Sequence, residues 1–317
     1  MEFPPKVSIV IPVFNGSDYL REAVESALAQ TYGNVEVLVV NDGSNDGGKS
    51  EEIARLYGDR IRYFRKENGG VGSALNLGIR EMRGEYFSWL SHDDVYYPGK
   101  IQVQMDRATE EKRNVVFYSD YDCIDPESRI IGRVRIPSIE PRALRAALVT
   151  LYPVNGCTVL APKSCLAAVG GFDERLKTTQ DYDLWFRMAK VYDFIHIPEL
   201  LIRSRIHSAQ GSLRLSDFTE KNLHFMKCLD ELYEEGDPAP TGESRTLFNA
   251  RAAVVLKKRG FMDAATHAYA LSLRDLPWRN RILDVPSVAW RMYFNLYDVR
   301  IRARRLKARF RLGTAAK

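Results

Sequence analysis

The chain has 317 residues, of which 45% are apolar and 27% charged, and it carries a net charge of +5. This composition is that of an ordinary globular protein with one large domain or two, and it excludes a disordered chain. The apolar runs are far shorter than the roughly 20 residues that span a bilayer, and the N-terminus shows no export signal. We therefore expect a cytoplasmic protein whose association with a membrane, if any, is peripheral.

Short β-branched runs alternate with longer amphipathic segments over the first hundred residues, which predicts βαβ units and a parallel sheet. Ser17 is expected to cap the first helix, and Pro98 to begin the helix after the fourth strand. The four predicted strands are 7–11, 35–40, 61–64 and 86–90, with helices between them.

The regular alternation ends after this part. We expect strands at 115–118, 130–136, 194–197 and 201–206, a buried segment at 158–161 and a helix from 180 to about 190. Three further helices are expected at 217–235, 243–258 and 264–272. We therefore place a boundary near residue 213, with an α/β domain over 1–213 and a helical region over 214–317.

The basic excess lies entirely in this helical region. Residues 1–213 hold 26 Lys and Arg against 29 Asp and Glu, whereas residues 214–317 hold 20 against 12. Near the end of the chain, an apolar stripe from Met292 to Phe310 is flanked by arginines, which predicts a basic amphipathic helix. Such a helix could lie on an anionic membrane surface, or pack on a partner or on its own domain. Nucleic-acid binding is not expected, because stacking aromatics and a known module are missing.

The four cysteines have neither the paired spacing of a zinc site nor the density of a disulfide scaffold, so reduced thiols in the core are expected.

Polar loops follow the first, second and fourth predicted strands, and they comprise residues 12–16, 41–47 and 91–94. Because open parallel sheets bind ligands at the carboxyl ends of their strands, these loops should line one cleft. Asp42 in the second loop can accept a hydrogen bond from the edge of a nucleotide base. Asp93 and Asp94 in the third can hold a hard divalent cation against a diphosphate, with His207 as a candidate third ligand.

A second acidic cluster, from Gln180 to Asp183, opens the predicted helix at 180. Transfer of a group from a nucleotide diphosphate to a hydroxyl needs a general base that takes the proton of that hydroxyl, and a carboxylate on the cleft wall can serve. Asp181 is our candidate for this base. The alternative is that these carboxylates only complement the helix macrodipole.

Taken in series, five motifs resemble those of glycosyltransferase family 2 over about residues 5–210. They are Pro12-Val13-Phe14-Asn15, Asn41 to Gly47, Glu67-Asn68-Gly69-Gly70, Leu90 to Asp94, and Gly170 to Glu174 with Asp181 to Trp185. The resemblance implies the GT-A fold, an α/β mixed sheet flanked by helices, followed here by a helical C-terminal segment. It also implies an inverting enzyme that takes a sugar from a nucleotide diphosphate, with UDP favoured.

Carried over by position, the resemblance assigns a nucleoside pocket formed by Pro12, Val13, Asn15, Asp42, Asn68 and Gly69. It implies that Asp93 contacts the ribose or metal, that Asp94 binds Mn²⁺ or Mg²⁺, and that His207 completes the metal shell. Many members carry an Asp where this chain has Ser91, which is a poor substitute for a carboxylate ligand.

Family analogy and the basic tail indicate a growing glycan or a lipid-linked acceptor in cell-surface polysaccharide synthesis. Two other classes stay open. A sugar-nucleotide nucleotidyltransferase would carry a glycine-rich basic loop after the first strand, but Phe14 to Asp18 contain no Lys or Arg. A non-catalytic protein that binds nucleotide sugars is compatible with Ser91, although Asp94 and Asp181 favour an enzyme.

Overall fold

The computed structural model describes residues 4–111, 113–208, 210, 218–236 and 243–274. Within these residues the chain forms one nine-stranded sheet in the order β3-β2-β1-β4-β8-β6-β9-β5, with β7 paired to β6. The strands are β1 (Val7–Val13), β2 (Val35–Asp42), β3 (Arg62–Lys66), β4 (Tyr86–Trp89), β5 (Val95–Tyr96), β6 (Val116–Ile124), β7 (Ile130–Val134), β8 (Leu160–Pro162) and β9 (Phe194–Arg205).

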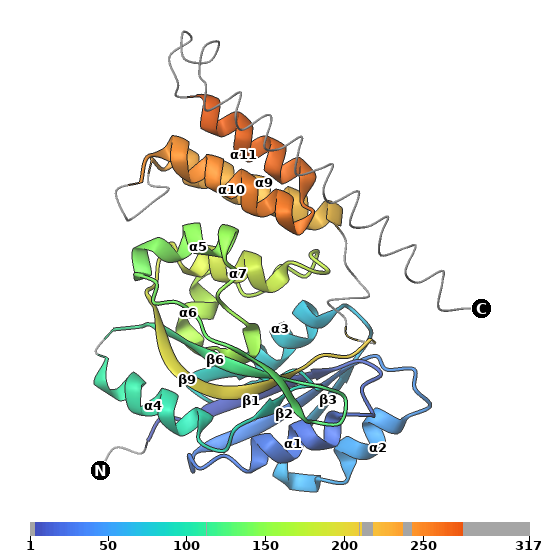
Figure 1. The fold of residues 1–317 in the computed structure, drawn as a ribbon. Coiled ribbons are helices and arrows are strands. Elements are labelled where there is room, and N and C mark those ends of the chain that lie inside the picture. The colour runs from blue at the N-terminus through green and yellow to red at the C-terminus, as the bar shows by residue number, and fades with distance from the viewer. Residues whose placement is uncertain (1–3, 112, 209, 211–217, 237–242, 275–317) are drawn as a thin grey trace, which may run out of the picture.

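Helices cover both faces of the sheet, and three more follow it in the chain. They are α1 (Leu20–Leu28), α2 (Lys49–Arg55), α3 (Val71–Glu81), α4 (Lys100–Glu110), α5 (Leu144–Thr150), α6 (Lys163–Ala168), α7 (Gln180–Met188), α9 (Phe218–Glu234), α10 (Arg245–Arg259) and α11 (Met262–Arg274). Figure 1 shows α1 and α2 on one face and α3, α6 and α7 on the other. This arrangement confirms the mixed sheet flanked by helices.

Four parallel strands form the first half of the sheet. β1 pairs in parallel with β2 and β4, and β2 with β3. All seven residues of β1 are buried, as expected of a β-branched strand that is covered by helices on both faces. The carboxyl ends of these strands therefore meet at one edge of the sheet, where Val13 lies opposite Asn41.

The second half of the sheet is antiparallel where it joins the first, since β8 pairs antiparallel with β4 and with β6. The two strands predicted at 194–197 and 201–206 are in fact one strand, β9, parallel to β6. Pro198 lacks an N–H for the ladder, and the register shifts beside Asp120, opposite this part of β9. The irregularity lets the strand continue past the proline.

The predicted helix starts at Ser17 and Pro98 are both wrong by a few residues. α1 begins at Leu20, and no side chain caps it; instead the Leu20 N–H donates to the carbonyl of Gly16 at 3.1 Å. α4 begins at Lys100 after Gly99. The Pro98 carbonyl accepts a hydrogen bond from the Thr31 N–H at 2.9 Å, so Pro98 fixes the loop to the end of α1.

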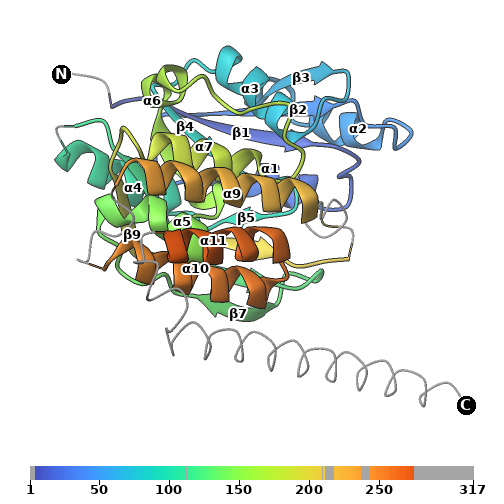
Figure 2. The ribbon, with the colours of Figure 1, turned by 90° about the horizontal axis from the view of Figure 1, so that it is seen from above.

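The C-terminal helices α9, α10 and α11 lie side by side above α5 and α7 (Figure 2). Glu220 of α9 anchors them, because its carboxylate accepts hydrogen bonds from the backbone N–H groups of Lys177, Thr178 and Thr179, each at 2.8 Å. The helical C-terminal region is thus bonded to the segment that leads into α7. The boundary expected near residue 213 and the basic helix expected at 292–310 lie outside the described residues.

Two expectations about the chain as a whole can be compared with the structure. All four cysteines are free thiols, and Cys157, Cys165 and Cys228 are buried, which confirms the core assignment for these three. Among the described helices, none is both long enough and apolar enough to cross a membrane.

Candidate active site

Asp42, at the end of β2, holds the loop that precedes α3. Its Oδ1 accepts hydrogen bonds from the Gly69 N–H at 3.0 Å and from Lys66 Nζ at 2.8 Å, and its Oδ2 accepts one from the Gly70 N–H at 2.7 Å. Gly70 has a φ of 89°, in the region that favours glycine. A carboxylate has about four acceptor positions, so these three contacts leave one position on Oδ2 for the edge of a base.

The two asparagines predicted for the nucleoside pocket connect loops in the structure. Asn15 Nδ2 donates to Asn45 Oδ1 at 2.7 Å, and the Asn45 N–H donates to Asn15 Oδ1 at 2.8 Å. These two hydrogen bonds join the loops after β1 and β2. Asn68 Nδ2 donates to the Asp42 carbonyl at 2.9 Å. Pro12 and Val13 are buried at the end of β1, opposite Val40 and Asn41 of β2.

Asp93 and Asp94 follow β4 and are both buried, with exposed fractions of 8% and 5%. Asp94 Oδ1 accepts a hydrogen bond from the Arg205 backbone N–H at 2.8 Å, and Asp93 Oδ2 lies 3.0 Å from His207 Nε2. Burial, together with the adjacent charge of Asp93, raises the pKa of Asp94 to about 7. A divalent cation would offset the desolvation and the mutual repulsion of these two carboxylates.

The residues present fit such a cation only in part. No cluster of three or more His, Cys, Asp or Glu side chains that could hold a metal occurs within the described part of the chain. Ser91 does not replace the missing carboxylate, because its hydroxyl accepts a hydrogen bond from the Cys157 thiol at 3.3 Å. Mg²⁺ and Mn²⁺ usually keep water and phosphate oxygens as ligands, so Asp94 and Asp93 fit a cation that a donor diphosphate and water would complete.

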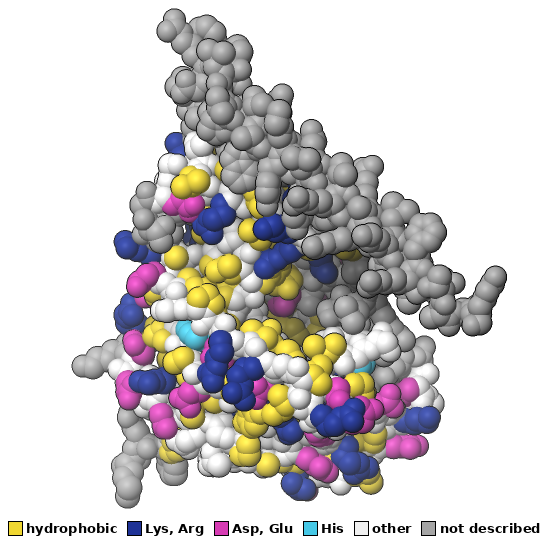
Figure 3. All heavy atoms as spheres, in the orientation of Figure 1, with side chains coloured by type: hydrophobic (Ala, Val, Ile, Leu, Met, Phe, Trp, Pro, Cys, Tyr) yellow, Lys and Arg dark blue, Asp and Glu magenta, His cyan; other side chains and the backbone are white. Residues whose placement is uncertain are grey.

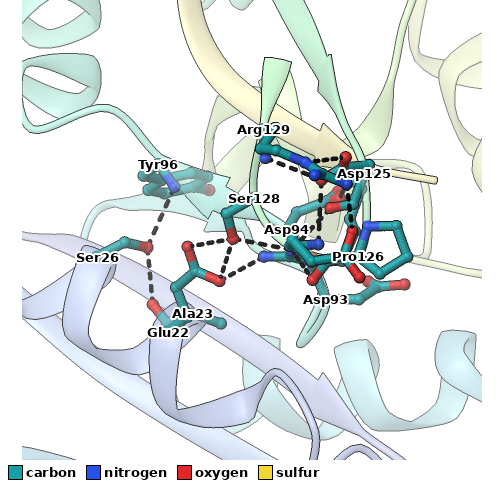
Figure 4. Close-up of polar contacts among 12 residues, drawn as sticks. Glu22, Ala23, Ser26, Asp93, Asp94, Tyr96, Asp125, Pro126, Ser128 and Arg129 are labelled. Carbon is teal, nitrogen blue, oxygen red and sulfur yellow. Dashed lines mark hydrogen bonds and ion pairs between the residues drawn. The ribbon is translucent and has the colours of Figure 1, made fainter. Parts of the chain in front are cut away.

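Arg205, at the end of β9, fixes the turn that carries this pair, and the sequence analysis missed it. Its side chain is fully buried, and Nε donates to the Asp93 carbonyl at 2.8 Å. The rest of the guanidinium bonds to the carbonyls of Asp125 and Pro126, to Ser128 Oγ and to Glu22. Figure 4 shows these partners gathered from α1, the β6–β7 turn and the loop after β4. The sequence did offer an indication of this residue, because an arginine stands at the end of an apolar strand, two residues before His207.

His92 closes the space between the loops after β1 and β4. A Cβ on Gly16 would lie 2.1 Å from His92 Cδ2, so only glycine permits this contact. Burial lowers the pKa of His92 below its usual value, which keeps the ring neutral. His207 packs edge-on to Tyr19 with 5.1 Å between ring centroids, and its Nε2 faces Asp93. Its role as a metal ligand stays a prediction.

Asp181 lies in the first turn of α7. Burial raises its pKa to about 6, although the N–H groups of Asp181 and Tyr182 and the charge of Lys221 act in the opposite direction. A carboxylate with this pKa is deprotonated at neutral pH and still basic enough to accept a proton. Asp183 differs, because its Oδ2 is held by Arg187 Nε at 2.7 Å. The structure therefore favours Asp181 over Asp183 as a base.

Asn76 of α3 connects the segment that leads to Asp181 with the loop around Asp42. Its Nδ2 donates to the Phe172 carbonyl at 2.9 Å, and its Oδ1 accepts from the Phe172 N–H at 3.0 Å. At the start of the same helix, a Cβ on Gly72 would lie 3.6 Å from Gln180 Cβ. The helix that begins at the Asp42 cradle thus also contacts the first residue of α7.

Comparison with known proteins places these features in a family context. The model described as "Glycosyl transferase family 2" matches residues 8–159. An uncharacterized glycosyltransferase of Rickettsia typhi is 43% identical over 278 residues, which cover 85% of this chain and 86% of that protein. One from Rickettsia felis is 47% identical over 258 residues, which cover 80% of this chain but only 42% of that protein. The chain therefore spans less than half the length of some relatives.

A solved structure supports the fold. Residues 1–349 of TarS from S. aureus, in complex with UDP, superpose with a TM-score of 0.58 at 18% identity, covering 87% of this chain and 77% of that one. A likeness at this identity shows the fold alone, and it confirms the GT-A architecture.

Proposed function

The chain belongs to glycosyl transferase family 2, and from that membership we propose that it transfers a sugar from a UDP-sugar, with inversion, to a hydroxyl of a glycan or lipid-linked acceptor in cell-surface polysaccharide synthesis. The observation that carries the proposal is the buried Asp93–Asp94 pair at the carboxyl end of β4. Among the described residues, only the His207 ring lies within ion-pair distance of these two carboxylates, at 3.0 Å from Asp93 Oδ2. UDP is favoured because it is the nucleotide bound to TarS, which shares the fold.

On the donor side, the loops after β1 and β2 border the base, and the free acceptor position of Asp42 receives its edge. Asp94 and Asp93 would hold Mn²⁺ or Mg²⁺ against the diphosphate, and this cation would screen the negative charge that builds on the leaving group. Arg205 keeps both carboxylates in place by bonding to the backbone of their turn.

On the acceptor side, Asp181 accepts the proton of the attacking hydroxyl. The hydroxyl oxygen forms a bond to the anomeric carbon on the face opposite the diphosphate, while the bond from that carbon to the phosphate oxygen breaks. The electron pair leaves with the nucleoside diphosphate. A single displacement of this kind inverts the anomeric centre.

Isothermal titration with UDP, GDP and dTDP, each with and without Mn²⁺, tests the donor site on wild type, Asp94→Asn and Asp181→Asn. We expect manganese-dependent binding of UDP, weakened at least about tenfold in Asp94→Asn, since this change removes one carboxylate ligand. Asp181→Asn should bind UDP normally. If no nucleotide binds under either condition, the donor-site assignment is wrong.

Turnover separates an enzyme from a non-catalytic sugar-nucleotide-binding protein. Loss of a general base typically lowers the rate about 10²–10⁴-fold. We therefore expect Asp181→Asn to release UDP from the UDP-sugar more slowly by that factor. Asp183→Asn is the matched control on the same helix, and it should retain turnover while losing its ion pair with Arg187. Unchanged turnover in Asp181→Asn would count against the assigned base.

The contact of the C-terminal segment with an anionic membrane stays a prediction, because residues 275–317 are outside the described part of the chain.

A further inference from the structure

A cleft of about 280 Å³ opens between the first turn of α7 and the C-terminal helices. Its lining residues are Tyr152, Tyr182, Lys221, Arg259 and Phe261. Tyr182 follows Asp181 in the chain, while Lys221 belongs to α9 and Arg259 to α10. Figure 3 shows dark blue Lys and Arg side chains at the rim of the hollow between these helices and the sheet. The cleft therefore lies between the residue that follows the proposed base and helices outside the βαβ part of the chain.

The two cations that line the cleft have no carboxylate within ion-pair distance among the residues described. Their neighbours on these helices are paired: Lys227 contacts Asp183 at 3.6 Å, and Arg251 contacts Glu243 at 2.8 Å. The charge of Lys221 acts on Asp181 only through space, where it lowers the pKa of that carboxyl. Among the described residues, the lining of the cleft thus carries two positive charges and no carboxylate.

The guanidinium of Arg259 is exposed and held in a fixed position. Its Cζ lies 4.1 Å from the centre of the Tyr152 ring, and Nη2 donates to the Leu151 carbonyl at 3.3 Å. A guanidinium carries five N–H donors, so these contacts leave others for an anion. Stacking on an aromatic ring is a common way to orient an arginine for carboxylate or phosphate.

The aromatic walls are rigid and partly strained. The Tyr152 and Tyr182 rings meet edge to face with 4.9 Å between centroids. Tyr152 also has a φ of 57°, unusual for a residue other than glycine. Such backbone strain persists only where the surroundings enforce it, and it concentrates at ligand sites. Apolar ring faces beside cations suit a sugar that carries a negative charge.

We propose that this cleft binds the acceptor, and that the acceptor carries a carboxylate or phosphate which Lys221 and Arg259 recognise. The inference rests on the proposed function, since it takes Asp181 as the base toward which the acceptor hydroxyl points. A neutral glycan would leave both cations without a counter-charge. The C-terminal helices therefore select the acceptor, while the loops at the strand ends bind the donor.

Binding of three defined probes to the full chain, measured by isothermal titration in the presence of UDP and Mn²⁺, tests the proposal. The probes are a tetrasaccharide of alternating glucuronic acid and N-acetylglucosamine, a trimer of glycerol phosphate, and neutral chitotetraose. We expect one of the two anionic probes to bind at least tenfold more tightly than chitotetraose. Which of them does so distinguishes a carboxylate from a phosphate acceptor.

The variants Lys221→Gln and Arg259→Gln should each lower the affinity for that anionic probe about tenfold, which corresponds to about 1.4 kcal/mol. Both should leave UDP binding unchanged. Arg259→Lys keeps the charge and should keep most of the affinity. Arg251→Gln is the matched control, because it removes one positive charge from the same helix at a residue paired with Glu243. Lys221 is only partly buried, so its variant is expected to fold even if an Arg259 variant does not.

Three results would overturn the proposal: equal binding of chitotetraose and both anionic probes, an equal loss in Arg251→Gln, or no binding of any probe by a protein that binds UDP. A protein that fails to bind UDP instead counts against the proposed function, so the two failures are distinguishable.

Discussion

Replacing Arg205 with lysine tests whether the Asp93–Asp94 turn depends on a buried guanidinium. The arginine side chain makes five hydrogen bonds, three of them to the carbonyls of Asp93, Asp125 and Pro126. Arg205→Lys keeps the positive charge but places all donors on one nitrogen. That single nitrogen cannot reach all the acceptors that lie around the edge of the planar guanidinium.

The cost follows from the number of acceptors left unpaired. Ser128 Oγ can still bond to the Glu22 carboxylate, which it already contacts at 2.9 Å. At least two of the three carbonyls then lose their donor. Each buried polar group left without a partner costs about 1–3 kcal/mol, so the loss of two donors should lower the free energy of unfolding by about 2–6 kcal/mol. Affinity for UDP with Mn²⁺ should fall as well, because the turn that carries Asp94 is loosened.

Urea unfolding at neutral pH measures the first effect, and isothermal titration the second. Arg129→Lys is the control, because Arg129 bonds to Asp125 in the same cluster but is 72% exposed. Surface pairs of this kind contribute about 0–1 kcal/mol. If Arg205→Lys loses no more stability than Arg129→Lys, the guanidinium does not hold the turn and our reasoning is refuted.

Three further predictions concern other contacts of the site. Gly16→Ala places a methyl group 2.1 Å from a histidine ring, so thermal melting should show a loss of about 1–3 kcal/mol, whereas Gly33→Ala, with nothing within 4 Å, should change little. Burial alone would raise the pKa of Glu220, but hydrogen bonds from the backbone ahead of α7 lower it. The Glu220 carboxylate therefore stabilises the folded protein fully above the unfolded pKa of about 4.3, and this stabilisation is lost as pH falls through the folded pKa. Glu220→Gln should remove that part of the acid sensitivity in unfolding curves, and an unchanged curve would contradict the anchor. Since Asp181 must be deprotonated to act, kcat/KM should rise with pH through about 6 and level off above it, and a flat profile between pH 5 and 8 would argue for another base.

Local patterns in the sequence were sufficient to predict the parallel half of the sheet. A strand buried on both faces has a continuous apolar sequence, and residues 37–40 of β2 form such a run, all four of them buried. The same alternation predicted that polar loops follow β1, β2 and β4. These loops were expected to lie together, because a parallel sheet places the carboxyl ends of its strands at one edge. The resemblance to the family then named residues in these loops, and their roles stay predictions.

Only the tertiary structure decided which partners these residues have. Arg205 lies more than a hundred positions from Asp93, and Glu220 about forty from the segment before α7. No periodicity links such pairs, because hydrogen bonds between distant segments depend on the path of the whole chain. The pair of Asp183 with Arg187 is different, because its i,i+4 spacing on α7 can be read from the sequence. The sequence by itself determined where the strands end and which residues stand there. The path of β9, which brings Arg205 to the Asp93–Asp94 turn, and the packing of α9, which brings Glu220 to the segment before α7, determined which partners these residues have.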